Sequence, residues 1–295
     1  MDNFLNIDGQ RRLETYFEEL GVLLGDVRRK ASFAMYCMGL ILDGDRKSME
    51  PIAARLAGNP EDTERAHDHL QHLLTDGKWK DRDVRRHAAY TGVAALMEHD
   101  QVRSWILDDT GFLKQGIHSV GVQRQYTGSA GKTANCQVAV SLTIASATDH
   151  VPIDFELYLP ECWANDPKRR LEAKIPDDIG FRTKPELALV VIDRALEDGI
   201  PEGVVLADSA YGDSSSFRYE LRLRELDYAV GVNPLTKVWR CDSRGRRRGE
   251  PISIQKLAQQ LPRNAIAGVR GKKEPTTPCT RASPGCAWCR STTTE

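Results

Sequence analysis

The chain has 295 residues, of which 40% are hydrophobic and 28% are charged, and its formal net charge is −1. This composition is typical of a globular protein with room for about two domains. The near-neutral charge argues against a uniformly basic nucleic-acid-binding surface. No apolar run approaches the roughly 18 residues of a membrane helix, and the N-terminus lacks the apolar core of a signal peptide. We therefore expect a cytoplasmic protein that does not enter a membrane.

The first part of the chain, residues 1–100, is predicted to be a helical domain. Its apolar residues recur at helical spacing, which places one face of each helix against a core. The segments with this spacing are 13–24, 31–42, 51–56, 62–74 and 84–97. No helix-turn-helix motif can be assigned from the pattern.

Two short apolar runs end in aspartate: Trp105-Ile106-Leu107 precedes Asp108 and Asp109, and Val204-Val205-Leu206-Ala207 precedes Asp208. Such runs predict strands that are buried on both faces. A carboxylate at the end of a strand is held on a rigid element, and two of them on neighbouring strands can bind a divalent cation. The alternative is that each aspartate only caps the following turn or helix.

The segments between the two runs suggest how these strands are arranged. Residues 135–144 and 151–158 predict an antiparallel hairpin, and 185–197 has the apolar spacing of a helix. After the second aspartate run, 214–226 predicts a helix and 228–232 a strand. This order is that of a ribonuclease-H-like α/β core, in which the first strand lies beside the fourth. Asp109 and Asp208 would then be neighbours.

Several motifs resemble the DDE endonuclease family of bacterial insertion-sequence transposases, in particular the insertion-sequence 701 group. The resemblance extends over roughly residues 10–268. The motifs that carry it include Asp108-Asp109-Thr110-Gly111-Phe112, Asn135-Cys136-Gln137-Val138, Gly180-Phe181-Arg182-Thr183-Lys184-Pro185 and Leu206-Ala207-Asp208-Ser209-Ala210-Tyr211-Gly212.

The resemblance implies a D-D-E triad that holds two divalent cations, Mg²⁺ or Mn²⁺, and cuts or joins DNA. Asp109 matches the first catalytic and metal-binding aspartate, with Asp108 as its rival, and Asp208 matches the second. Hard oxygen ligands of this kind suit Mg²⁺. The third residue, a glutamate on a later helix, cannot be placed in this chain, so we expect this copy to be inactive alone.

The resemblance also implies double-stranded DNA as the partner, both insertion-sequence ends and target, and it allows a homodimer. Basic residues near the first catalytic strand and in a later arginine run are candidates for phosphate contacts. They are Lys114, Arg124, Lys132, Arg244, Arg246, Arg247 and Arg248. A solvated loop is the alternative interpretation of the arginine run.

The expected organisation continues with a catalytic core over 101–233 and the start of a basic insertion over 234–270. Residues 271–295 have neither helical nor strand period, and we interpret this tail as irregular and as an out-of-frame readout of a truncated or frameshifted copy. Two alternatives involve its cysteines: a zinc site with Cys279, Cys286 and Cys289 as three of its four ligands, or a redox pair of Cys286 and Cys289.

Two other functions remain open. The chain could be a non-catalytic DNA-binding protein that occupies transposon ends and regulates transposition. It could also be a phosphohydrolase of the haloacid-dehalogenase type, which uses strand-end aspartates. That enzyme class needs an Asp-x-Asp-x-Thr order, whereas Asp108, Asp109 and Thr110 are contiguous here.

Overall fold

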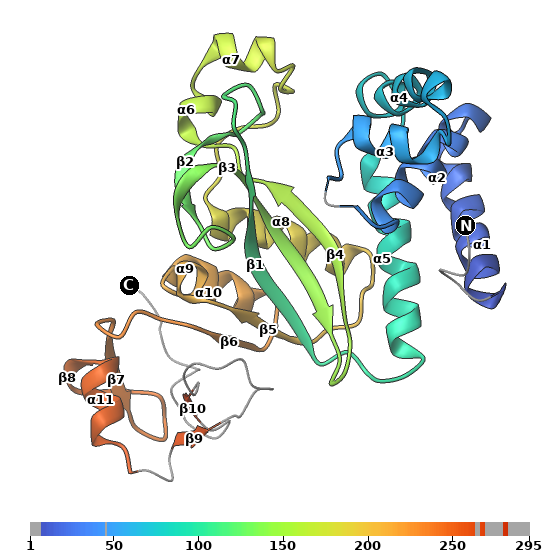
Figure 1. The fold of residues 1–295 in the computed structure, drawn as a ribbon. Helices are drawn as coiled ribbons and strands as arrows, with labels where there is room; N and C mark the ends of the chain where they lie inside the picture. Colours follow the sequence, from blue (N-terminus) through green and yellow to red (C-terminus); the bar gives the residue numbers. More distant parts are fainter. Residues whose placement is uncertain (1–6, 45, 263–265, 269–279, 283–295) are drawn as a thin grey trace. The chain divides into compact units, whose positions relative to one another are not determined.

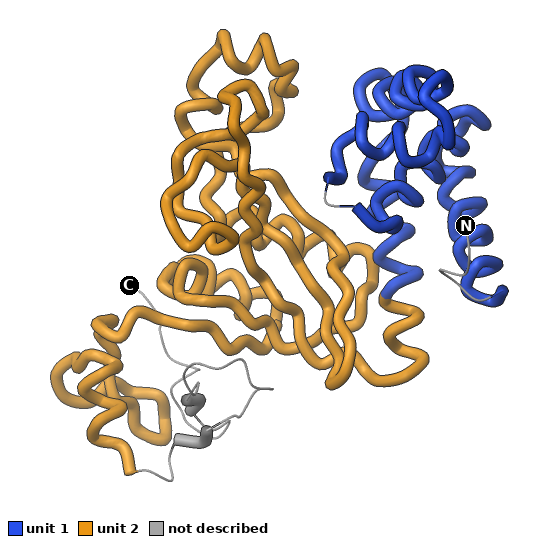
Figure 2. Tube along the Cα trace, viewed as in Figure 1, with its two compact units in different colours: residues 1–92 blue, residues 93–295 orange. Residues whose placement is uncertain are grey.

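The computed structural model describes residues 7–44, 46–262, 266–268 and 280–282. The chain divides into two compact units, residues 1–92 and 93–295 (Figure 2). The division falls inside a helix, so this helix belongs partly to each unit. No helix within the described ranges is long and apolar enough to cross a membrane.

Unit 1 is helical, as the sequence predicts. Its helices are α1 (Ile7–Leu24), α2 (Val27–Ile41), α3 (Met49–Leu56), α4 (Pro60–Thr75) and α5 (Asp81–Met97), the last of which continues into unit 2. Asp26 and Asn59 cap α2 and α4 by accepting hydrogen bonds from main-chain N–H groups. One apolar cluster joins α3 and α4 through Ile52 and Leu70, which are fully buried.

Unit 2 is built on a mixed sheet. Its strands are β1 (Ser104–Leu113), β2 (Gln123–Thr127), β3 (Lys132–Ala145), β4 (His150–Leu157), β5 (Val204–Ala207) and β6 (Tyr228–Val230). β3 pairs antiparallel with β1, with β4 and, through its first residues, with β2. β5 pairs parallel with β1 and with β6 (Figure 1). This is the ribonuclease-H-like order, with the short β2 added at one end of β3.

The prediction that the two aspartate-bearing strands are neighbours in the sheet is confirmed. Ile106 of β1 pairs in register with Leu206 of β5, and both strands run in the same direction. The predicted burial of these strands on both faces is wrong. Trp105, Leu107 and Val205 are buried, whereas Val204 is exposed. Alternate residues point to opposite faces, so the core lies mainly against one face of the sheet.

Helices connect the strands and cover this core. α6 (Glu161–Ala164) and α7 (Pro167–Glu172) follow β4, and α8 (Lys184–Glu197) leads to β5. α9 (Ser209–Gly212) and α10 (Ser215–Leu223) lie between β5 and β6. α8 packs on β3 and β4, behind the sheet in Figure 1, and α9 and α10 contact α8. The sequence did not predict β2, α6 or α7.

The described C-terminal part begins with a hairpin of β7 (Lys237–Cys241) and β8 (Arg247–Ser253), followed by α11 (Ile254–Gln260). β9 (Ile266–Gly268) and β10 (Thr280–Ala282) pair antiparallel. β10 is the described portion of the tail that we interpret as irregular. Cys279, Cys286 and Cys289, the candidate zinc or redox residues, lie outside the described residues.

Candidate active site

The candidate site lies where β1 and β5 approach the same edge of the sheet. Asp109 lies on β1 three positions after Ile106, and Asp208 follows β5 two positions after Leu206. Extended by two residues, the pairing of Ile106 with Leu206 sets Asp208 beside Asp108, with Asp109 one position further along β1, so both aspartates of β1 lie near Asp208. Asp109 and Asp208 are 99 positions apart in the sequence, and the parallel pairing of β1 with β5 brings their strands together.

The backbone around Asp208 is tightly packed. Gly231 donates its N–H to the carbonyl of Ala207 at 2.9 Å, and a Cβ built on Gly231 would approach the main chain of Asp208 and Ser209. A Cβ on Gly212 would lie 1.9 Å from the carbonyl oxygen of Gly231. Glycine at these two positions lets α9 and the end of β6 pack closely, and this packing fixes the turn that carries Asp208.

Asp208 caps α9, since its Oδ1 accepts a hydrogen bond from the Ala210 N–H at 2.8 Å. The capping alternative considered from the sequence is therefore part of the arrangement. Capping occupies one carboxylate oxygen, and Oδ2 of Asp208 has no hydrogen-bond partner among the described residues. This oxygen is free to bind a ligand.

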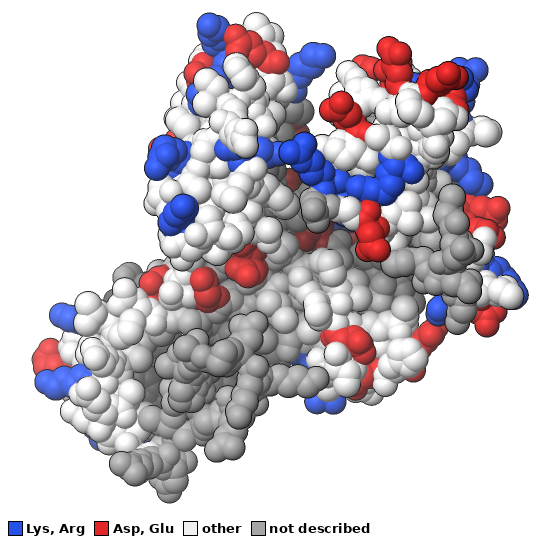
Figure 3. Space-filling view, in the orientation of Figure 1, with Lys and Arg blue, Asp and Glu red and all other residues white. Residues whose placement is uncertain are grey.

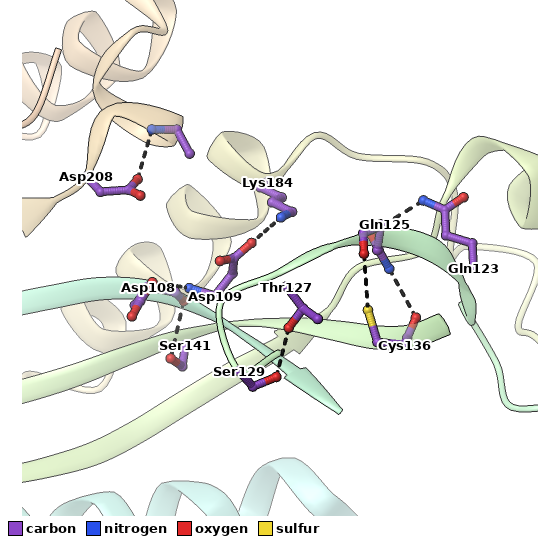
Figure 4. Close-up of polar contacts among 11 residues, drawn as sticks. Asp108, Asp109, Gln123, Gln125, Thr127, Ser129, Cys136, Ser141, Lys184 and Asp208 are labelled. Atoms are coloured by element: carbon purple, nitrogen blue, oxygen red, sulfur yellow. Dashed lines mark hydrogen bonds and ion pairs between the residues drawn. The ribbon is translucent and has the colours of Figure 1, made fainter. Parts of the chain in front are cut away.

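Asp109 and Asp108 point to opposite faces of β1, as expected for successive strand residues. Lys184 at the start of α8 forms an ion pair with Oδ2 of Asp109. The carboxylate of Asp108 instead accepts the Asp109 N–H at 2.7 Å. In Figure 4, the Asp109 carboxylate is directed toward Lys184, and the Asp108 side chain extends to the other side of the strand.

Tyr211 of α9 shows that negative charge is concentrated here. Its side chain is 1% exposed, and its hydroxyl is a buried polar atom without a hydrogen-bond partner among the described residues. Burial raises the pKa of Tyr211, and the charges of Asp109, Asp108 and Asp208 raise it further. The Tyr211 hydroxyl therefore stays neutral at physiological pH.

Lys184 was not among the site residues predicted from the sequence. Thr183 caps α8 in a capping box with Glu186, which fixes the first turn and the position of the next residue, Lys184. The segment 180–185 was singled out only as a motif of the family. A lysine at the start of a helix after a capping threonine was the available signal, but nothing local indicates that it reaches β1.

The basic residues near β1 that were predicted to contact DNA do not all lie on one face of the sheet. The β1–β3 and β2–β3 registers place Lys132 on the same face of the sheet as Asp109, and Arg124 on the opposite face. Both side chains are exposed. Lys114 follows β1, where its N–H donates to the carbonyl of Asn135 at 2.9 Å. On the face shown in Figure 3, Lys and Arg side chains lie over the β2–β3 region, and acidic side chains lie near α9.

The arginine run lies on the β7–β8 hairpin, where all four guanidinium-bearing residues are exposed. Two of them are paired with the acidic residue of the turn: Arg246 lies 3.1 Å and Arg248 3.4 Å from Asp242. Hydrogen bonds from the main-chain N–H groups of Arg246 and Arg244 lower the pKa of Asp242. Hydrogen bonds from the guanidinium groups of Arg246 and Arg248 lower it further. Arg247 lies over the Trp239 ring at 4.8 Å. The two ion pairs with Asp242 offset part of the positive charge that the hairpin presents.

The donor set fits a hard divalent cation in part. Two carboxylates on rigid elements, with phosphate oxygens and water, are a common arrangement for Mg²⁺. Within the described ranges, however, no three His, Cys, Asp or Glu side chains form a group that could hold a metal ion. The third carboxylate of a complete triad is therefore not found among the described residues.

The chain was compared with known proteins. It is 31% identical over 221 residues to a protein described as the probable transposase for insertion sequence element IS701 from Microchaete diplosiphon; the match covers 75% of this chain and 53% of that protein. The chain thus spans about half the length of this curated relative. Among solved structures, the Mos1 transposase paired-end complex with left transposon end matches with 14% identity and a TM-score of 0.23, over 65% of this chain and 56% of that one.

The family comparison covers most of the chain. The model of the DDE superfamily endonucleases matches residues 19–281, which include both aspartates and the whole six-stranded sheet. Enzymes of this family generally use divalent metal ions. The chain belongs to the DDE superfamily endonucleases, among which its relative is an insertion-sequence transposase.

Proposed function

We propose that unit 2 is the catalytic core of a transposase that cleaves and transfers DNA strands at the ends of an insertion sequence. Asp109 and Asp208 are the proposed metal ligands, and Mg²⁺ or Mn²⁺ is the proposed cation. The observation that carries this proposal is the parallel pairing of β1 with β5, which brings the two strand-end carboxylates to one edge of the sheet. Membership of the family supports the same assignment.

The chemistry follows from the charges at this edge. A divalent cation, when bound, stabilises the charge that builds on the attacking and leaving oxygens of a phosphodiester. Asp109 and the free oxygen of Asp208 would hold the cation from β1 and from the turn after β5, so little reorganisation would be needed. Lys184 places a positive charge beside Asp109, where it can attract a DNA phosphate. The buried Tyr211 lies within the electrostatic influence of the same carboxylates, whose charges help to raise its pKa.

DNA is the proposed partner because its phosphates complement the basic residues around the site. Lys132 shares the Asp109 face of the sheet and is proposed to contact the strand being cut. Lys114, Arg124 and the hairpin residues Arg244, Arg246, Arg247 and Arg248 would contact more distant phosphates. Such contacts release counterions, so affinity should fall steeply with salt.

A non-catalytic DNA-binding protein is the second candidate. The observation in its favour is that the described residues supply two carboxylates rather than three. Binding of metal by Asp109 and Asp208 would favour the endonuclease, since a protein that only occupies DNA ends needs no metal. The phosphohydrolase alternative receives no support from the family match.

The proposal can be tested by Mn²⁺ binding, followed by electron paramagnetic resonance in the presence of short duplex DNA. Asp109→Asn and Asp208→Asn should each weaken binding by at least about tenfold, because even partners that only orient metal ligands are worth that much. Asp108→Asn separates the two candidates on β1: unchanged affinity supports Asp109 as the ligand, whereas a similar loss would assign that role to Asp108, which lies in register with Asp208. Equal Mn²⁺ affinity in all three variants and the unaltered protein would refute the proposed metal site.

A further inference from the structure

A cavity of about 490 Å³ opens in unit 2 close to the candidate site. It is lined by residues from β2, from the segment after β4, from α6 and from the loop before α8. The lining residues are Gln123, Tyr158, Pro160, Glu161, Cys162 and Phe181. None of them is among the residues proposed to bind metal or phosphate. Its volume lies within the range of sites that bind small organic groups.

The cavity is linked to the metal site through Lys184. The ammonium group of Lys184 lies 6.0 Å from the centroid of the Tyr158 ring and also pairs with Asp109. In Figure 4, Lys184 lies between Asp109 on one side and Gln125 and Gln123 on the other. A DNA strand whose phosphate lies at Lys184 would therefore have its adjacent nucleoside within reach of the cavity.

The walls of the cavity are aromatic. The rings of Tyr158 and Phe181 lie 6.3 Å apart with an interplanar angle of 68°, so one ring offers its face and the other its edge. Phe181 is 38% exposed, so part of its ring remains open to solvent beside Tyr158. Unpaired bases bind single-strand-binding proteins by stacking on such aromatic surfaces.

The polar residues of the cavity select for a base rather than a phosphate. Glu161 contributes an exposed carboxylate, which would repel an anion but can accept a hydrogen bond from an exocyclic amino group of a base. The Gln123 amide oxygen accepts a hydrogen bond from the Cys162 thiol at 3.5 Å, and its amide nitrogen donates to Gln125 at 3.4 Å. The positive charge needed for the phosphate lies outside, on Lys184.

The cavity is also held in shape by the fold. The Tyr158 N–H donates to the Val138 carbonyl at 2.8 Å, and the indole N–H of Trp163 donates to the Val122 carbonyl at 2.8 Å. Arg170 donates to the carbonyls of Pro176 and Ile179, which fixes the loop that leads to Phe181. Such preformed walls lower the entropic cost of binding.

We propose that this cavity binds one unpaired nucleobase of the DNA whose backbone lies at Asp109 and Lys184. The proposal rests on the function proposed above and adds a base-binding site beside its metal site. The base is displaced from the duplex next to the reacting phosphodiester. Because Glu161 accepts hydrogen bonds, a base with an exocyclic amino group is favoured over thymine.

The test compares a blunt duplex with the same duplex carrying a single-stranded overhang that contains 2-aminopurine. Phe181→Ala should bind the overhang DNA about tenfold more weakly, the order expected for one lost stacked base, and bind the blunt duplex as before. Stacking should quench 2-aminopurine fluorescence in the unaltered protein and in Phe181→Trp, but not in Phe181→Ala. Tyr219→Ala is the matched control, because this 44% exposed ring lies on α10, outside the cavity.

A second measurement needs no substitution. Overhang DNA should protect Cys162 of the unaltered protein from alkylation by iodoacetamide, measured by peptide mass spectrometry, and blunt DNA should not. Equal affinities of Phe181→Ala and the unaltered protein for overhang DNA, or equal Cys162 alkylation with both DNAs, would overturn the base site. If free dAMP binds as tightly as the overhang DNA, the cavity serves a mononucleotide and the proposal is also wrong.

These outcomes can be distinguished from failure of the proposed function. Binding of blunt DNA and of Mn²⁺ by Asp109 and Asp208 depends on neither Phe181 nor Cys162. If both persist without any response to the overhang, only the base site is refuted. If the protein binds no DNA at all, both proposals are refuted.

Discussion

Arg194 links the helix that carries Lys184 to the sheet that carries Asp109. Its guanidinium lies 3.2 Å from Asp154 and 2.5 Å from Glu156, both on β4. The Asp154 side chain is only 5% exposed, whereas Arg194 and Glu156 are 24% and 26% exposed. The two carboxylates raise the pKa of Arg194, although burial opposes them. We predict that Arg194→Met destabilises unit 2.

The size of the effect follows from the buried carboxylate. Removing one partner of a buried ion pair costs about 3–5 kcal/mol, because the other charge remains without compensation. Asp154 keeps a hydrogen bond from the Phe155 N–H at 2.9 Å, and Arg194 is partly hydrated, so we expect the lower end, about 3 kcal/mol. For a unit of this size, such a loss lowers Tm by roughly 6–12 °C.

Thermal unfolding followed by circular dichroism measures this change. Arg103→Met is the matched control, because Arg103 is 61% exposed and its pair with Asp100 at 3.4 Å should contribute less than about 1 kcal/mol. The double variant Arg194→Met with Asp154→Asn should recover part of the loss, since the buried side chain at 154 is then uncharged and only the more exposed Glu156 lacks its partner. Equal Tm values for the Arg194→Met and Arg103→Met proteins would show that the Arg194 ion pairs do not stabilise unit 2.

Three further predictions concern the site. Lys184→Gln should raise the affinity for Mn²⁺ in the absence of DNA by up to about fivefold, because Asp109 no longer pairs with an ammonium group. Isothermal titration calorimetry measures this affinity, and no increase would mean that the ion pair does not compete with the metal. Gly212→Ala should lower the free energy of unfolding in urea by about 1–3 kcal/mol, because the new Cβ would collide with the Gly231 carbonyl. Gly180→Ala is the control, since a Cβ there has open space, and equal losses in the two variants would contradict the close packing around Gly212. The unaltered chain should bind terminal DNA but leave it uncut in Mg²⁺, since no third carboxylate joins Asp109 and Asp208 among the described residues. Cleavage that Asp208→Ala abolishes would show that a further ligand completes the site.

The strand order of the core could be predicted because its signals are local and repeated. Trp105, Leu107 and Val205 mark buried strand positions, and the aspartates mark strand ends. Burial on both faces was wrong because a run of four apolar residues does not reveal that Val204 is exposed. β2 was missed because Gln123–Thr127 is almost entirely polar and becomes a strand only through pairing with β3.

The contacts of the site could be predicted only in part. The register that brings Asp109 and Asp208 together follows from the fold type. The pairing of Lys184 with Asp109 depends on how α8 packs on the sheet, and no spacing within the sequence encodes this. The aromatic cavity likewise combines four separate segments, so Tyr158 and Phe181 carry no local signal of their proximity.

Asp109 and Asp208 are proposed to bind the same divalent cation. The most direct test is a crystal structure of the protein with short duplex DNA and Mn²⁺, in which anomalous scattering locates the metal. We predict a peak ligated by both carboxylates, at a distance close to the roughly 2.1 Å of Mg²⁺–oxygen bonds. A peak ligated by Asp108 instead, or no peak between β1 and β5, would contradict it.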